Sequence, residues 1–270
     1  MAVKAIYLIL KARYLFIDTI IKGGFKAVKK NTEKFNKLRR FDERAKKGQK
    51  IPPPIKLNKR YSLGEEIFNA VSHGTGGLLA IAGTVVLIIF CAIYSDVWAV
   101  VSAAVYGASL IILYTMSTLY HAITNEQAKK FFRIMDHNTI FFLIAGTYTP
   151  FTLVTLHGKT GWILFGIVWG AALVGITLNS INLEKFKKPS IVCYIAMGWV
   201  IIFAIKPMLD SLPKAGLILL LAGGVSYTVG VIFYAQKKLK YFHSIWHLFT
   251  VAGSVLHYFS VFIALVPVLK

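Results

Sequence analysis

The sequence predicts an all-α membrane protein whose main part is a bundle of seven transmembrane helices. Hydrophobic residues make up 56% of the 270-residue chain, and the mean hydropathy is +0.63. This balance is too apolar for a soluble domain of this length and is typical of a multi-pass membrane protein. Apolar stretches of about 17–25 residues recur along the chain, and each is long enough to cross a bilayer core of about 30 Å.

Residues 1–60 form a strongly basic N-terminal extension before the first span. They contain 18 Lys or Arg against four acidic residues, and so supply much of the formal net charge of +20. A basic segment beside a first span is retained in the cytoplasm and attracts anionic lipid. Ile6, Leu10 and Ile17 fall at helical spacing, which predicts an amphipathic helix in the membrane interface, followed by a Pro-rich linker at 52–54. An eighth span and nucleic-acid binding are the alternatives, but no nucleic-acid-binding fold is visible.

Residues 61–270 are expected to form the seven-helix domain. The spans are predicted at 69–94, 97–121, 135–156, 161–182, 190–206, 213–235 and 243–267. The fifth is the shortest. The connections between them are short and carry most of the remaining charged residues, which is the pattern of helices joined by turns at the two faces of a membrane.

Basic residues in the short loops predict how the bundle is oriented. The loops after the second, fourth and sixth spans contain Lys129, Lys130, Arg133, Lys185, Lys187, Lys188, Lys237, Lys238 and Lys240, whereas the other side has Lys159, Lys206, Lys214 and Lys270. Cytoplasmic loops carry the excess of Lys and Arg. We therefore expect a cytoplasmic N-terminus, an outside C-terminus and insertion in the plasma membrane.

Four ionisable residues are expected at the cytoplasmic ends of the spans. His121 ends the second span, Asp136 lies in the first turn of the third, and His243 and His247 occupy the first two turns of the last. The spacing of His243 and His247 puts both on one helix face, about 6 Å apart in depth. Ionisable side chains within spans are costly and mark functional sites. The four residues therefore predict a metal site, with zinc as the metal.

The residue types at this site favour a catalytic zinc. Three imidazoles leave one tetrahedral position open for water, which zinc converts into a nucleophile near neutral pH. Asp136 would orient or deprotonate that water, or hold a ligand histidine. Ser117 lies one turn before His121 and would hydrogen-bond the ligand set or stabilise an oxyanion. A serine within a span also commonly bonds its own helix, which is the structural alternative for Ser117.

The remaining histidines are expected to have other roles. His73 begins the first span at the same level and would stand behind the ligands. His137 points about 100° away from Asp136 around the helix and is left out of the ligand set. His157 is expected in an outer loop, and His257, in the middle of the last span, should make a buried polar contact.

These motifs resemble the hemolysin III family, the bacterial branch of the progestin and adiponectin receptor (PAQR) group, within a wider superfamily of ceramidase-like membrane hydrolases. The resemblance covers about residues 61–270. It rests on Ser117 and His121, on Met135-Asp136-His137 leading to Ala145-Gly146-Thr147-Tyr148-Thr149-Pro150, on His243-Ser244-Ile245-Trp246-His247, and on Tyr61-Ser62-Leu63-Gly64-Glu65-Glu66.

The resemblance implies zinc held by His121, His243 and His247. Asp136 would lie behind a bound water, with Ser117 as its partner. Relatives act as receptors or hydrolyse lipid amides, and the family name refers to cytolytic activity. This chain shows no amphipathic barrel pattern of a pore former.

Two functions remain open at this point. The first is a zinc-dependent hydrolase of a lipid amide or ester. The second is a non-catalytic membrane sensor or a cytolysis-associated protein whose zinc is structural. A channel or transporter is a weaker third interpretation, because the ionisable groups gather at one face instead of following a path across the bilayer.

Overall fold

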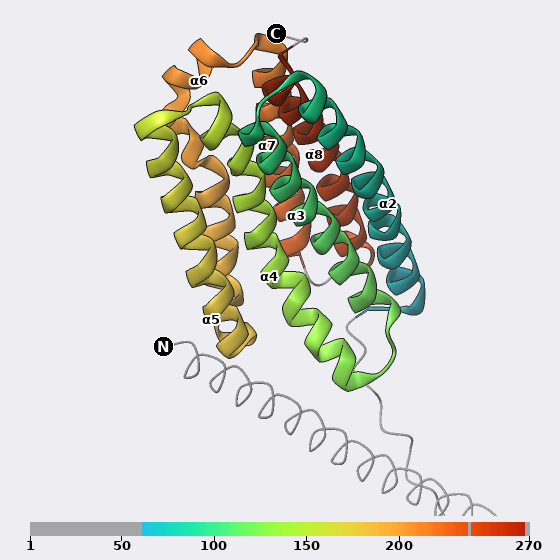
Figure 1. Cartoon of the computed structure of the whole chain (residues 1–270). Helices are drawn as coiled ribbons and strands as arrows, with labels where there is room; N and C mark the ends of the chain where they lie inside the picture. The colour runs from blue at the N-terminus through green and yellow to red at the C-terminus, as the bar shows by residue number, and fades with distance from the viewer. Residues whose placement is uncertain (1–60, 237–238, 268–270) are drawn as a thin grey trace, which may run out of the picture. The chain divides into compact units, whose positions relative to one another are not determined.

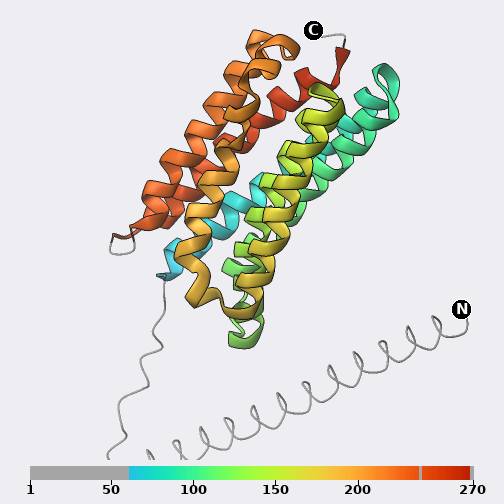
Figure 2. The same cartoon turned by 90° about the vertical axis from the view of Figure 1, so that its left-hand side faces the viewer.

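The computed structural model describes residues 61–236 and 239–267, and every regular element in these residues is a helix. The long helices run side by side along one axis (Figures 1 and 2). The elements are α2 (Leu63–Tyr94), α3 (Val97–Ala122), α4 (Glu126–Pro150), the π-helical turn η1 (Phe151–Thr155), α5 (Gly158–Trp199), the 3₁₀ turn η2 (Val200–Ala204), α6 (Ile205–Ser211), α7 (Lys214–Ala235) and α8 (Phe242–Leu265). The interfacial helix and linker predicted within residues 1–60 lie outside the described residues.

Side-chain caps begin the first three helices, and their short polar residues are readable in the sequence. The Ser62 hydroxyl accepts from the backbone N–H of Glu65 while the Glu65 carboxylate accepts from that of Ser62. Asp96 caps α3 and Asn125 caps α4 by accepting from backbone N–H groups of the first turn. Such caps satisfy N–H groups that a helix leaves without partners. They explain why short connections separate α2, α3 and α4.

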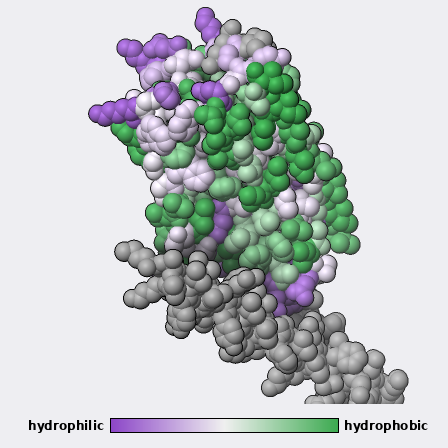
Figure 3. Space-filling model, viewed as in Figure 1, coloured by the Kyte–Doolittle hydropathy of each residue, from purple (hydrophilic) through white to green (hydrophobic). Residues whose placement is uncertain are grey.

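In residues 61–236 and 239–267, five helical segments are long and apolar enough to cross a membrane: α2, α3, the run Gly158–Ser211, α7 and α8. Their outward faces carry large hydrophobic side chains, such as Phe203, which is 88% exposed. Hydrophobic residues cover much of the face in Figure 3, with a large group of hydrophilic residues at its upper end. A surface of this kind faces lipid. The chain is therefore a membrane protein whose described part is all-helical, and the count of seven spans stays a prediction.

The fourth and fifth predicted spans belong to one helical run, Gly158–Ser211. We expected the fourth span to end at 182 and a polar connection to follow up to 190. The first helix does end at Asn182, which adopts the extended angles φ −157° and ψ 91°, but the next helix begins directly after it, so the expected connection is helical. The Asn182 side chain accepts from the backbone N–H of Lys185 at 3.0 Å, as an N-cap does. The run reverses here, so that its two parts lie side by side (Figures 1 and 2).

The third predicted span, 135–156, corresponds to η1 and the later part of α4, which begins at Glu126, so that Asp136 lies in the third turn of the helix and not in the first. This segment is not among the five apolar ones, because α4 is the least apolar of the long helices. It packs against α3, α5 and α8, and its second half is almost wholly buried. A helix enclosed by other helices does not need a lipid-facing apolar surface, which explains how α4 can carry polar residues of the site described next.

Candidate metal centre

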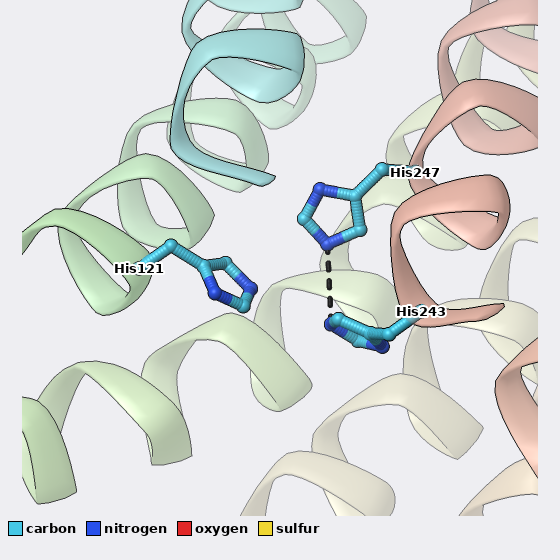
Figure 4. A group of neighbouring side chains, drawn as sticks. All are labelled: His121, His243 and His247. Carbon is cyan, nitrogen blue, oxygen red and sulfur yellow. Dashed lines mark hydrogen bonds between the residues drawn. The ribbon is translucent and has the colours of Figure 1, made fainter. Parts of the chain in front are cut away.

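Three histidines meet at one end of the bundle. His121 lies in the last turn of α3, and His243 and His247 lie in the first two turns of α8. Each offers a nitrogen, and the three nitrogens lie within 4.8 Å of one another (Figure 4). His121 is 3% exposed and His247 is 1% exposed. The antiparallel course of α3 and α8 therefore brings together residues more than a hundred positions apart in the chain.

The ring nitrogens of this cluster are suited to a metal ion. His247 Nε2 and His243 Nε2 are 3.2 Å apart (Figure 4, dashed line). His121 Nε2 is buried and has no hydrogen-bond partner among the described residues. A buried nitrogen without a partner is costly, and three imidazole nitrogens at these separations form a donor set that zinc accepts. The residues present thus fit the metal that the sequence analysis expects.

Asp136 and Ser117 lie next to the histidine cluster. The Asp136 carboxylate lines a small cavity together with His243 and His247. Ser117, on α3, is fully buried and neighbours Asp136, yet its Oγ has no hydrogen bond of normal geometry to any described residue. The hydroxyl therefore does not bond its own helix, which was the structural alternative. The structure brings all five predicted site residues to one place, while their roles stay predictions.

Two cavities adjoin at this place. The small one has a volume of about 20 Å³, enough for about one water molecule. A larger cavity of about 120 Å³ is lined almost entirely by apolar side chains of α4, α5, α7 and α8. Leu113, Ile140, Trp246 and Thr250 line both cavities. The small cavity with its polar groups therefore lies directly beside the larger apolar cavity.

The other histidines take up contacts outside the ligand set. His73 stacks on the ring of His247 with centroids 3.6 Å apart, in line with a place behind the ligands. His137 contacts the Arg133 carbonyl oxygen through Nδ1 and the Tyr234 hydroxyl through Nε2, so its exclusion from the ligands agrees with the structure. His257 donates from Nε2 to the carbonyl oxygen of Leu220 at 3.0 Å, the expected buried polar contact.

Sequence reasoning missed three polar residues of α2 that contact the ligands. Glu66 Oε2 lies 2.6 Å from His121 Nδ1, and Asn69 Nδ2 lies 3.5 Å from the same nitrogen. Ser72 Oγ lies 3.4 Å from His247 Nδ1. We placed Glu66 in the segment before the first span and gave the other two no role. Their spacing of three residues along an apolar helix is the signal that could have identified them.

Comparisons with known proteins show which family the chain belongs to. The family model described as "Haemolysin-III related" matches residues 61–258. Hemolysin-3 of Bacillus cereus is 47% identical over 203 residues, which cover 75% of this chain and 93% of that protein. The Hemolysin-3 homolog of Bacillus subtilis (strain 168) is 46% identical over 201 residues, which cover 74% of this chain and 94% of that protein.

A more distant similarity extends to animals. The monocyte to macrophage differentiation factor of Homo sapiens is 25% identical over 228 residues, which cover 82% of this chain and 93% of that protein. The expected relation to PAQR-type proteins is thereby confirmed. With its apolar helices and its match across most of its length, the chain is a multi-pass integral protein of the plasma membrane and belongs to the haemolysin-III-related family.

Proposed function

We propose that this protein is a zinc-dependent hydrolase that cleaves a lipid amide or ester at the cytoplasmic face of the membrane. The observation that carries the proposal is the position of three histidine nitrogens within 4.8 Å of one another beside an apolar cavity. His121, His243 and His247 would hold the metal. Zinc bound in this way polarises a carbonyl group and lowers the pKa of a bound water.

Asp136 and Ser117 would act around the metal. Asp136 borders the small cavity and is the only carboxylate among its lining residues, so it is the group that would accept a proton from a water held there. Ser117 neighbours that carboxylate, and its buried Oγ lacks a normal hydrogen bond among the described residues. We assign Ser117 the task of orienting Asp136, since a buried hydroxyl is stable only with a partner.

The apolar cavity would bind the acyl chain of the substrate. Its lining is almost free of polar surface, and cavities of this kind bind hydrocarbon because it is removed from water there. Because Trp246 and Thr250 border both cavities, a substrate whose acyl chain lies in the larger cavity would have its carbonyl group close to the histidines. A lipid amide or ester has this combination of a polar bond and an apolar chain.

We further propose seven spans, a cytoplasmic N-terminus and an outside C-terminus. The reversal of the run Gly158–Ser211 at Asn182 supports counting it as two spans, and the burial of α4 among other helices supports counting α4 with η1 as one. The basic residues of the short loops favour this orientation. The histidine cluster would then face the cytoplasm, where the basic N-terminal extension would bind anionic lipid.

The test of this function is the substitution Asp136→Asn in purified, zinc-loaded protein. With ceramides and other long-chain lipid amides and esters as substrates, we expect hydrolysis by the wild type and a fall of about 10²–10⁴-fold in the variant. The zinc content should stay the same, because Asp136 is not among the three histidine ligands. Hydrolysis at the wild-type rate by the variant would contradict the proposal.

A structural zinc is the second candidate, because the histidines join α3 to α8 and a metal there would hold the two helices together. Under this alternative, a sensor or cytolysis-associated protein would work unchanged with Asp136→Asn. Zinc-loaded wild-type protein that cleaves none of the lipids tested would favour it.

A further inference from the structure

Helix α2 supplies no nitrogen to the histidine cluster, yet it turns several polar residues towards it. Glu66, Asn69 and His73 lie on one face of the helix, with Ser72 at the edge of that face. Asn69 is fully buried and His73 is 3% exposed. Polar groups buried in an apolar span are costly without partners, and Glu66 and Ser72 lie within hydrogen-bonding distance of the ligand histidines.

Glu66 determines which nitrogen of His121 carries the proton. A carboxylate only accepts hydrogen bonds, so the proton in the 2.6 Å contact between Glu66 Oε2 and His121 Nδ1 belongs to the nitrogen. In a neutral imidazole, the lone pair then resides on Nε2. This is the buried atom that has no partner among the described residues. The contact therefore presents His121 Nε2 for metal binding.

Lys129 holds Glu66 in place for this contact. Its Nζ lies 2.9 Å from Glu66 Oε1 and also reaches the carbonyl oxygens of His121 and Ile123 at the end of α3, at 3.5 and 3.4 Å. The second carboxylate oxygen is thereby occupied, and the first remains directed at His121. One lysine of α4 thus links α2 to the end of α3 at the ligand itself.

Ser72 acts on His247 in a similar way. The Ser72 hydroxyl donates to the carbonyl oxygen of Asn69 at 3.1 Å, so its oxygen is free to accept from His247 Nδ1, which is 3.4 Å away. His247 Nε2 is then the unprotonated nitrogen, and this atom faces His243. His73 stacks on the His247 ring and limits its rotation.

We propose that α2 is the positioning element of the metal centre: Glu66 and Ser72 hold His121 and His247 as their Nδ1-protonated tautomers, so that both histidines direct Nε2 at the metal. Glu66 is the dominant residue, because its contact is shorter and charged. The inference rests on the proposed zinc site but not on hydrolysis. Partners behind metal-binding histidines raise metal affinity by about 10–100-fold.

The experiment measures the zinc affinity of the purified full-length protein by competition with a chromophoric chelator. Glu66→Gln should weaken zinc binding about 10–100-fold, and Ser72→Ala about 2–10-fold. Glu65→Gln is the matched control. Glu65 is the neighbouring carboxylate, but it contacts Ser62 and the backbone N–H of Tyr241, so its loss should leave the zinc affinity within about twofold of the wild type.

Thermal unfolding of the metal-free variants separates positioning from stability. A merely structural role of Glu66 would lower the melting temperature without changing the zinc affinity of the folded protein, and that result would overturn the inference. If Glu66→Gln does not fold, Ser72→Ala decides, because it removes only one hydroxyl. Unchanged zinc affinity in that variant would then overturn the inference.

The outcomes separate this inference from the proposed function. Zinc binding that depends on Glu66 in a protein that hydrolyses no lipid would refute the hydrolase and leave the positioning role intact. Hydrolysis and zinc affinity that are both unchanged in Glu66→Gln would refute only the positioning role. A folded wild type that binds no zinc would overturn both.

Discussion

At the scale of single residues, the site consists of costly buried groups, some of which have hydrogen-bond partners while others have none among the described residues. His121 and His247 are buried in a part of the bundle where an unpaired polar atom is expensive. Each uses Nδ1 for a partner on α2, and the Nε2 atoms are left at the centre of the cluster. The arrangement explains why these side chains tolerate burial and why histidine, with two different nitrogens, occupies these positions.

Metal content checks the ligand set directly. We expect about one zinc per chain in freshly purified wild-type protein and none in His247→Ala, because two remaining imidazoles bind zinc too weakly to retain it. His257→Ala is the control, since His257 lies on the same helix but contacts the Leu220 carbonyl oxygen, and it should keep its zinc. Elemental analysis of the three proteins measures this. Full metal retention by His247→Ala would rule out the assigned ligand.

At the scale of elements, polar side chains hold the reversal in Gly158–Ser211. Asn182 leaves the helical conformation and caps the next segment by accepting from the Lys185 backbone N–H. A second contact crosses the reversal, because the Ser190 hydroxyl donates to Asn179 Oδ1 at 2.8 Å. These contacts bring the two parts of the run together, and Lys187 follows the reversal with its ammonium group over the ring of Tyr234.

Removing the Asn182 cap should destabilise this element. We expect Asn182→Ala to lower the free energy of unfolding by about 1 kcal/mol, because the Lys185 N–H loses its acceptor. Asn182→Asp keeps an oxygen at that position and should stay close to the wild type. Thermal unfolding in detergent compares the three proteins. An unchanged melting temperature for Asn182→Ala would show that the cap does not hold the reversal.

The apolar cavity allows a test of where the acyl chain binds. Gly198 lines the cavity and has open space where a side chain would start, so Gly198→Leu should fill part of it. We expect kcat/KM to fall about tenfold for long-chain substrates and to change little for short-chain ones. Gly166 also has open space and is exposed like Gly198, but it does not line the cavity, so Gly166→Leu is the control. An equal loss of kcat/KM for long-chain and short-chain substrates would show that the acyl chain binds elsewhere.

At the scale of the whole molecule, the fold is a set of helices with a polar centre at one end and apolar outer faces. The three histidines connect α3 with α8, and Glu66 and Lys129 extend the connection to α2 and α4. Four helices are thus joined at one end of the bundle.

The orientation of the bundle can be checked by cysteine labelling. In protein in which Cys91 and Cys193 are replaced by serine, we expect Lys159→Cys to react with a membrane-impermeant thiol reagent in intact cells. Lys130→Cys should react only after the cells are opened, because the excess of Lys and Arg keeps its loop inside. Labelling of Lys130→Cys in intact cells would reverse the proposed orientation.

The sequence predicted much of the site because the depth of a residue in the membrane follows from its position along an apolar helix. Each helix rises about 1.5 Å per residue, so the ends of the apolar stretches placed His121, Asp136, His243 and His247 at one level without any knowledge of packing. Hydropathy was less informative for α4, because a helix buried among other helices needs no apolar outer face. It also missed the continuation of helix beyond Asn182, since a single cap gives no signal in an average over many residues.

By itself, the sequence determined the class of the protein, the helices of its core and the set of residues that meet at the cluster. These properties follow from apolar length and from spacing along a helix, which are local. The tertiary structure alone decided that Glu66, Asn69 and Ser72 lie behind the histidines and that an apolar cavity adjoins them. Such contacts depend on how each helix is rotated about its axis, and that rotation is set by packing against all its neighbours at once.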